Sequence, residues 1–179
     1  MESSSQIEAI TLYDKVLAID PNNVDVLANM GGALYDLGQI EVAITYIDKA
    51  LALDPNNSIA LKNKGASLFN VGQYQEAIDL YDKVLASSPN NTLVLANKGG
   101  ALASLGQYQE AMVYIDKALA LDPSSLIGLM NKASVLSLMG QNPEALTWID
   151  KALERDANNT RISEIKKTIQ ESMKESTLF

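Results

Sequence analysis

The stretch from Leu93 to Pro123 decides the fold, and it reads L-V-L-A-N-K-G-G-A-L-A-S-L-G-Q-Y-Q-E-A-M-V-Y-I-D-K-A-L-A-L-D-P. Leu95, Gly99 and Leu102 follow one another at steps of four and three, which places them on one face of a helix. Gly106 ends this helix, because glycine adopts the left-handed conformation without a Cβ penalty. A second helix follows, and the closing proline ends it because proline has no amide hydrogen. The stretch therefore predicts two helices joined by a turn.

The same pattern returns at one constant interval without an insertion. Prolines, turn glycines and small second-helix residues all keep this interval: Pro21, Pro55, Pro89 and Pro123; Gly38, Gly72, Gly106 and Gly140; Ala43, Ala77, Ala111 and Ala145. A helix–turn–helix unit that repeats about every 34 residues is typical of the tetratricopeptide repeat family. The chain resembles that family because its large, small and proline positions are filled by Leu27, Gly31, Leu34, Ala43, Ile47, Ala50 and Pro55. The resemblance implies an all-α, right-handed α-solenoid of such repeats.

The repeat register, meaning this constant spacing of equivalent positions, predicts the limits of the repeats. We expect four complete units with a single helix at each end: a half repeat at 6–23, repeats at 24–57, 58–91, 92–125 and 126–159, and a capping helix at 160–175. The half repeat consists of a second helix, predicted from Gln6 to Asp20, without its first helix. Either the chain is a piece of a longer solenoid or the protein begins on a half repeat. In the fourth unit, we expect Asn142 to act as the N-cap in front of Pro143.

The composition limits the possible functions. The chain has no cysteine and no histidine, which excludes disulfides, thiolate metal sites and the commonest general base. Its 14 basic and 22 acidic residues give a formal charge of −8, which disfavours nucleic acids and anionic membrane surfaces as partners. No apolar run of the roughly 18 residues needed to span a membrane is present. We expect a cytoplasmic, non-catalytic protein without a cofactor.

Small residues recur where the two helices of one unit should meet. Gly31, Gly65 and Gly99 lie in the middle of first helices, where each costs roughly 1 kcal/mol relative to alanine. The repeated alanines of the second helices should face these glycines and let the two helices approach closely. The dispersion attraction between the closely packed helices should offset the cost. We interpret these positions as structural.

The family resemblance implies that first helices line a concave groove. One polar residue type recurs on the predicted inner face, at Asn29, Asn63, Asn97 and Asn131. An asparagine amide offers two donors and an acceptor, which suits the backbone of an extended ligand. Alternatively, the asparagines tie neighbouring hairpins together. If the face binds a peptide, we expect Asn63 and Asn97 near its middle, with the neighbours Ile59, Leu93, Phe69 and Lys62.

A lysine follows three of these asparagines, at Lys64, Lys98 and Lys132. We expect each to point towards the neighbouring hairpin and to be paired there rather than to bind a ligand. The predicted function is a protein–protein interaction scaffold that binds an extended peptide or a helix. The alternatives are a self-associating structural segment and a regulatory or substrate-recruiting fragment of a larger protein. Self-association would use Ile7, Ile10 and Tyr13 of the half repeat, as a weak homodimer.

Overall fold

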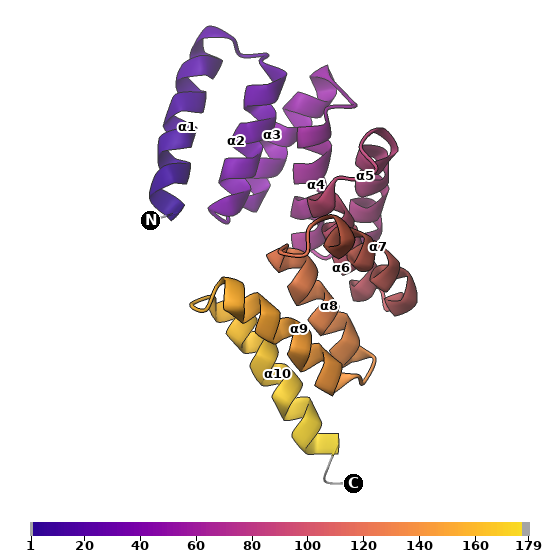
Figure 1. Cartoon of the computed structure of the whole chain (residues 1–179). Helices are drawn as coiled ribbons and strands as arrows, with labels where there is room; N and C mark the ends of the chain where they lie inside the picture. The colour runs from indigo at the N-terminus through magenta and orange to yellow at the C-terminus, as the bar shows by residue number, and fades with distance from the viewer. Residues whose placement is uncertain (1, 177–179) are drawn as a thin grey trace. The chain divides into compact units, whose positions relative to one another are not determined.

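The computed structural model describes residues 2–176, with the side chains of residues 5–174. Within this part the chain forms ten α-helices and no strand (Figure 1). The predicted all-α class is confirmed. The helices are α1 (Glu2–Ile19), α2 (Val24–Asp36), α3 (Ile40–Leu53), α4 (Ser58–Asn70), α5 (Tyr74–Ser87), α6 (Thr92–Ser104), α7 (Tyr108–Leu121), α8 (Leu126–Leu138), α9 (Asn142–Arg155) and α10 (Thr160–Ser176).

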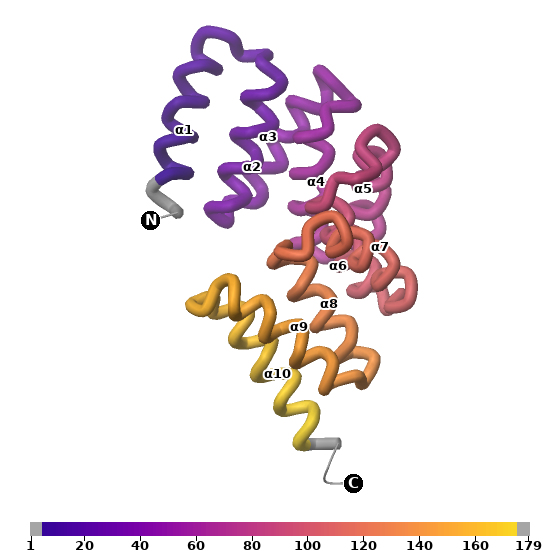
Figure 2. Tube along the Cα trace, in the orientation of Figure 1, coloured from indigo at the N-terminus to yellow at the C-terminus, as the bar shows by residue number. Residues whose placement is uncertain are grey.

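The chain divides after Ser87 into two compact units, unit 1 (Met1–Ser87) and unit 2 (Ser88–Phe179). In unit 1, α2 and α3 form one hairpin and α4 and α5 form the next, while α1 packs against α2 alone (Figure 2). In unit 2, the hairpins are α6 with α7 and α8 with α9, and α10 packs against both α8 and α9. Helices that are consecutive in the chain are therefore packed in pairs.

Asparagine caps and glycine turns set the ends of the helices. The backbone N–H of Val26 donates to Oδ1 of Asn23, and that of Ala60 donates to Oδ1 of Asn57, which satisfies donors that a helix start leaves free. Between the two helices of each hairpin the chain turns through a glycine with φ between 76° and 83°. This left-handed conformation is one that side chains with a Cβ rarely adopt. The glycines with these angles are Gly38, Gly72, Gly106 and Gly140.

Each mid-helix glycine lets the two helices of its hairpin approach closely. A Cβ added at Gly99 would lie 2.5 Å from Cγ1 of Ile115 and 3.1 Å from the carbonyl oxygen of Ala111. At Gly65 the nearest atom would be Cε1 of Tyr81, at 2.5 Å. The close approach is as predicted. The predicted neighbour of each glycine was an alanine of the second helix. The nearest atom belongs instead to the large side chain one turn beyond that alanine.

Helix α1 differs from the prediction in its start and in its buried face. It begins at Glu2 rather than at Gln6. Ile10, Tyr13 and Leu17 pack against the core formed by α2 and its neighbours. Of the three residues expected to mediate self-association, Ile7 is exposed, whereas Ile10 and Tyr13 are half-buried and keep part of their surface open.

Helix α10 covers the last hairpin through apolar side chains and a polar contact. Ile162 and Ile169 are fully buried against it. Asn142 joins them as a buried polar residue, because its Oδ1 accepts from Ser137 Oγ at 2.9 Å and its Nδ2 donates to Ser172 Oγ at 3.2 Å. The predicted N-cap role of Asn142 is wrong. Gln141 is the N-cap, and Asn142 is the first helical residue, with its side chain held between α8 and α10.

Candidate functional site

In unit 1, the predicted ligand-binding asparagine Asn63 is hydrogen-bonded to the neighbouring hairpin. Its Nδ2 donates to the carbonyl oxygen of Ala28 on α2, at 2.9 Å. Gly32 makes room for this amide, because a Cβ there would lie 2.8 Å from Nδ2 of Asn63. The bond uses the second lone pair of a mid-helix carbonyl. It ties α4 to α2.

The same arrangement recurs in unit 2. Nδ2 of Asn131 on α8 donates to the carbonyl oxygen of Ala96 on α6, at 2.9 Å. Gly100 takes the place of Gly32, and a Cβ there would lie 3.0 Å from Nδ2 of Asn131. A glycine at this position, in the repeat that precedes the asparagine, is therefore the sequence signal of the tie. These two glycines had no part in the site predicted from the sequence.

The four predicted asparagines thus fall into two pairs. Asn63 and Asn131 each use one amide hydrogen to tie helices together, which favours the structural interpretation for that hydrogen. Asn29 on α2 and Asn97 on α6 have no side-chain hydrogen bond within their own units, among the described residues. All four are half-buried, so each amide retains contact with solvent.

The remaining predicted residues surround these asparagines on the same helices. Ile59, Lys62 and Phe69 share α4 with Asn63, and Leu93 shares α6 with Asn97. The ring of Phe69 meets that of Tyr74 edge-on, with 5.3 Å between centroids. Lys62 is half-buried and forms no ion pair with any described residue. Unit 1 therefore contains five of the eight predicted site residues (Asn29, Ile59, Lys62, Asn63 and Phe69), and unit 2 contains Leu93, Asn97 and Asn131.

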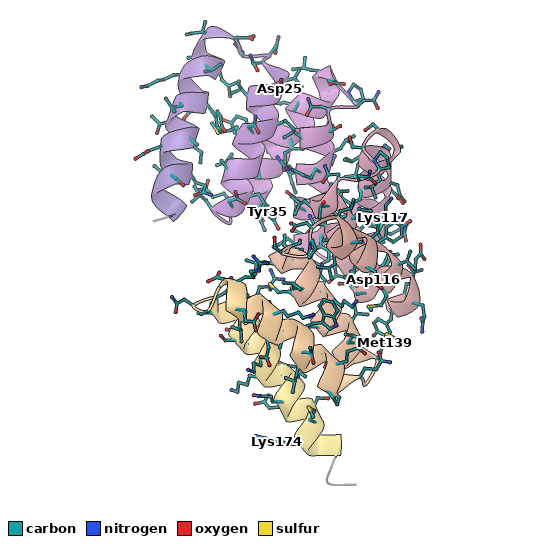
Figure 3. The ribbon with its side chains drawn as sticks, viewed as in Figure 1. Asp25, Tyr35, Asp116, Lys117, Met139 and Lys174 are labelled. Carbon is teal, nitrogen blue, oxygen red and sulfur yellow. The ribbon has the colours of Figure 1, made fainter. Side chains whose placement is uncertain are left out.

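Lys64 and Lys132, which follow two of the asparagines, are paired with the neighbouring hairpin, as predicted. Nζ of Lys64 lies 2.7 Å from Oδ1 of Asp48, and Nζ of Lys132 lies 2.6 Å from Oδ1 of Asp116, which Figure 3 labels on α7. In both cases the lysine comes from a first helix and the aspartate from the second helix of the preceding repeat. Lys166 of α10 forms the same pair with Asp150. These lysines hold adjacent hairpins together.

Aromatic rings of the second helices extend this pairing in unit 2. Lys98 is only 4% exposed, and its Nζ donates to Tyr114 Oη at 3.0 Å and lies 4.1 Å from the ring centroid. The ring of Trp148 has two lysine amines beside it, since Nζ of Lys132 and Nζ of Lys151 each lie 4.0 Å from its ring centroid. A cation over an aromatic face is attracted by the ring's quadrupole.

Charge is distributed unevenly between the two units and between the two kinds of helix. Unit 1 contains five lysines and twelve acidic residues, a net charge of −7, whereas unit 2 contains nine basic and ten acidic residues, a net charge of −1. Helices α4, α6 and α8 contain no acidic residue. Their exposed surface is therefore neutral to basic within an otherwise acidic chain.

Among the described side chains, those of Tyr81 and Asp122 have perturbed pKa values. Burial raises the pKa of Tyr81 well above its usual range, and a smaller contribution comes from Tyr35, which Figure 3 labels on α2. Hydrogen bonds from the hydroxyl and backbone N–H of Ser124 hold the pKa of Asp122 below its usual range.

In the described part of the chain, no three acidic side chains gather into a group that would hold a metal ion. No helix there is long and apolar enough to cross a membrane.

The sequence matches the tetratricopeptide repeat family over residues 28–92 and over 68–125 and 102–169, and it matches the TPR repeat over residues 5–38. The chain belongs to the tetratricopeptide repeat family. Proteins of this family mediate protein binding and are usually non-catalytic.

Solved structures of the family share this fold. A MamA protein covering residue 41 to the end, from Desulfovibrio magneticus RS-1, is 26% identical with a TM-score of 0.69, over 87% of this chain and 88% of that one. YrrB, described as a TPR protein with an unusual peptide-binding site, is 22% identical with a TM-score of 0.64, over 90% and 84%. A tetratricopeptide repeat protein from Parabacteroides merdae is 18% identical with a TM-score of 0.72, over 96% and 68%. No curated protein matches the sequence.

Proposed function

We propose that the chain is a protein-interaction scaffold that binds an extended peptide or a helix on the face of its first helices. The observation that carries this proposal is the composition of α4, α6 and α8. These helices carry half-buried asparagines, exposed apolar residues such as Leu93 and Ile127, and no acidic residue. Such a surface suits the backbone and apolar side chains of a peptide that is neutral or acidic.

Within this proposal, the asparagines have different roles. Asn29 and Asn97 contact the ligand backbone with both amide hydrogens and the oxygen. Asn63 and Asn131 keep one hydrogen for the tie between helices and offer the ligand the other hydrogen and Oδ1. Lys62 attracts an acidic group of the ligand, and Ile59, Leu93 and Phe69 contact its apolar side chains.

The test separates binding from stability. Peptides that bind the full chain are selected from a random displayed library, and one of them is titrated against variants. Asn97→Ala should weaken binding roughly 2- to 10-fold, because one hydrogen bond contributes about 0.5–1.5 kcal/mol. Its unfolding midpoint should stay unchanged. Asn63→Ala should lower the unfolding midpoint as well, since it removes the bond to Ala28.

Asp79→Lys on the exposed side of α5 is the control and should leave affinity unchanged, because this side belongs to a second helix. If Asn97→Ala and Asn29→Ala both bind the selected peptides as tightly as the parent, the asparagines do not contact ligand. If Asp79→Lys alone abolishes binding, the ligand lies on the second-helix side.

Self-association through α1 is the alternative function, because this helix leaves apolar side chains exposed. Two copies would bring together two units with a net charge of −7 each, so the dimer would be weak. Sedimentation of the full chain over a range of concentrations decides this point, and a monomer throughout excludes it. A recruiting segment of a larger protein would use the same first-helix face.

A further inference from the structure

One register position on the first helices of unit 2 carries three exposed side chains. They belong to the second residue of each helix: Leu93 on α6, Ile127 on α8 and Arg161 on α10. Leu93 and Ile127 are each 39% exposed, and Arg161 is exposed as well. Helix α8 contacts both α6 and α10, which do not contact each other among the described residues. The three residues therefore lie in one row across neighbouring helices, which we call the end row of unit 2.

Arg161 is the cation of the end row. It forms no ion pair with any described residue, although Glu164 lies three positions further along α10. Lys132 of the same unit differs, because it is paired with Asp116. The helix dipole disfavours a cation in the first turn of a helix, so local helix stability does not account for Arg161. The end row therefore offers a ligand two apolar side chains and one positive charge.

The charge of the end row selects the chemistry of the ligand. The row contains no acidic residue, whereas Asp25 of α2 and Ile59 of α4 occupy the same register position in unit 1. A carboxylate on the ligand would be attracted by Arg161 and repelled by Asp25. Charge complementarity therefore favours a ligand that brings apolar side chains and one carboxylate to unit 2.

The spacing of the helices selects the backbone conformation of the ligand. The axes of packed helices are about 8–10 Å apart, so neighbouring members of the end row would contact ligand side chains about that far apart. A polyproline II helix has three residues per turn and rises about 9 Å per turn, so every third side chain points in the same direction at a matching spacing. Side chains on one face of a β-strand repeat about every 6.6 Å, which does not match.

A second row of residues favours the same ligand. Asn97 and Asn131 lie four positions after Leu93 and Ile127, on the same side of their helices. Asn97 has no side-chain hydrogen bond within unit 2 among the described residues, and Asn131 uses one amide hydrogen for its bond to Ala96. A polyproline II backbone has no internal hydrogen bonds, so its polar groups are available to these amides. The backbone groups of a bound α-helix are already paired within that helix.

We propose that the end row of unit 2 binds a polyproline II segment of a partner protein. The segment carries two apolar residues and one aspartate or glutamate, with two other residues between each of them. Leu93 and Ile127 contact the apolar side chains, Arg161 pairs with the carboxylate, and the asparagines bond to the backbone. This inference rests on the proposed function, because it names the class of peptide that the first-helix face takes.

The experiment uses the full chain and two defined peptides, Leu-Pro-Pro-Leu-Pro-Pro-Glu and the reverse sequence Glu-Pro-Pro-Leu-Pro-Pro-Leu. Both directions are used because the end row sets the spacing of the ligand and not its direction. Each peptide has an amidated C-terminus and an N-terminal fluorescent label, so glutamate is its only carboxylate. The prolines favour polyproline II and prevent an α-helix. The parent should bind at least one peptide saturably, as measured by fluorescence anisotropy.

Two variants test the two parts of the end row. Arg161→Glu should weaken binding about fivefold, because repulsion replaces an exposed ion pair. A peptide with lysine in place of glutamate should reverse this order and bind Arg161→Glu more tightly than the parent. Ile127→Asp should weaken binding about tenfold, since the contact with a leucine is lost. The fold accepts an aspartate at this register position, because Asp25 occupies it in α2.

Two controls are matched to these variants. Lys167→Glu makes the same reversal of charge at an exposed position of α10, six residues from Arg161 and on another side of the helix. Val113→Asp is matched to Ile127→Asp, because it changes an exposed apolar residue of α7, which is a second helix. Both controls should bind the peptides within about twofold of the parent, as expected for surfaces away from the site.

Three results would overturn the proposal. The first is the absence of saturable binding of either peptide by the parent. The second is equal binding by the parent, Arg161→Glu and Ile127→Asp. The third is tighter binding of an alanine-based peptide that presents the same leucines and glutamate two helical turns apart, which would make a helix the occupant.

The peptides selected from the displayed library separate this proposal from the proposed function. If they bind Arg161→Glu and Ile127→Asp as tightly as the parent, the end row is not their site, and the first-helix proposal still stands. If Asp79→Lys alone abolishes their binding, the first-helix proposal itself fails.

Discussion

The two terminal helices, α1 and α10, are both single helices where a complete repeat has two, and they end their units differently. In α1 the face that lacks its partner is apolar. In α10 the corresponding face carries the exposed residues Ser163, Lys167 and Gln170, while Ile162 and Ile169 are buried on the other side. These equivalent faces therefore differ in polarity, and a polar outer face is the property that a capping helix of an α-solenoid has.

The largest expected effect contrasts one isoleucine from each helix. Ile169→Asp in α10 should lower the free energy of unfolding by at least about 3 kcal/mol, because it removes a fully buried side chain and buries a charge. Ile19→Asp in α1 should change it by less than about 0.5 kcal/mol, since Ile19 is exposed. Urea unfolding followed by circular dichroism measures both values. Equal losses would contradict the distinction between a buried isoleucine in α10 and an exposed one in α1.

A smaller effect compares a complete hairpin with the terminal half repeat. Gly99→Leu should force α6 and α7 apart and reduce stability by about 1–3 kcal/mol. Lys167→Leu, at the same register position in α10, should stay within about 0.5 kcal/mol because no second helix faces it among the described residues. Thermal unfolding of the two variants is the measurement. A large loss at Lys167 would mean that this face of α10 is covered after all.

The contact that fixes α10 gives the next prediction. Asn142→Ala leaves the hydroxyls of Ser137 and Ser172 without their partner and should cost about 1–2 kcal/mol. The loss should concentrate in α10, so the amides of that helix should exchange with deuterium faster than those of α6. Asn158→Ala, at an exposed position in the loop before α10, is the control and should have no effect. Uniformly faster exchange throughout unit 2 would argue against a local role.

Alkaline pH should act on unit 1, which contains α1. Burial raises the pKa of Tyr81, so the folded chain keeps a proton that the unfolded chain loses above pH 10.0. Stability is complete below that pH and falls as the pH rises further. Tyr81→Phe should remove part of this fall, as measured by urea midpoints at pH 8 and pH 11. An identical pH dependence in the variant would show that Tyr81 ionises freely in the folded state.

Acid should have the smallest effect, and it should act on unit 2. Ser124 lowers the pKa of Asp122 below its ordinary value of 3.8. The stability that the hydrogen-bonded carboxylate of Asp122 contributes is present at a pH above its ordinary pKa. It is lost as the pH falls through the lower pKa that this carboxylate has in the folded chain. The carboxylate is exposed, so the contribution is small. Asp122→Asn should show a slightly weaker loss of stability than the parent between pH 5 and pH 2, and an equal loss would contradict the assignment.

The repeated positions could be predicted from the sequence because each local signal recurs with one spacing. Gly106 and its equivalents fix the turns, and the paired lysines follow from their place on the helix. For Asn63 the sequence left open whether the side chain binds a ligand or ties hairpins together, because the acceptor of its bond is a backbone carbonyl that composition does not reveal. Gly32, which lies in the preceding repeat, becomes informative only once the helices are seen side by side.

Positions that depart from the repeat were harder to interpret. Asn142 stands where Tyr74 and Tyr108 occur in earlier repeats, and the sequence suggested a cap rather than a bond to another helix. The start of α1 was also predicted too late, because a polar run at a terminus carries no hydrophobic period. In both cases the outcome depends on interactions that have no counterpart in the other repeats.

The position of Trp148 has a practical consequence for spectroscopy. It is the only tryptophan of the chain, and it lies in unit 2, where the amines of Lys132 and Lys151 are each 4.0 Å from its ring centroid. Its emission therefore reports on the packing of α8 and α9, while circular dichroism reports on all helices. The ratio of the two signals during unfolding shows whether unit 1 and unit 2 melt together, and no dye or added label is needed.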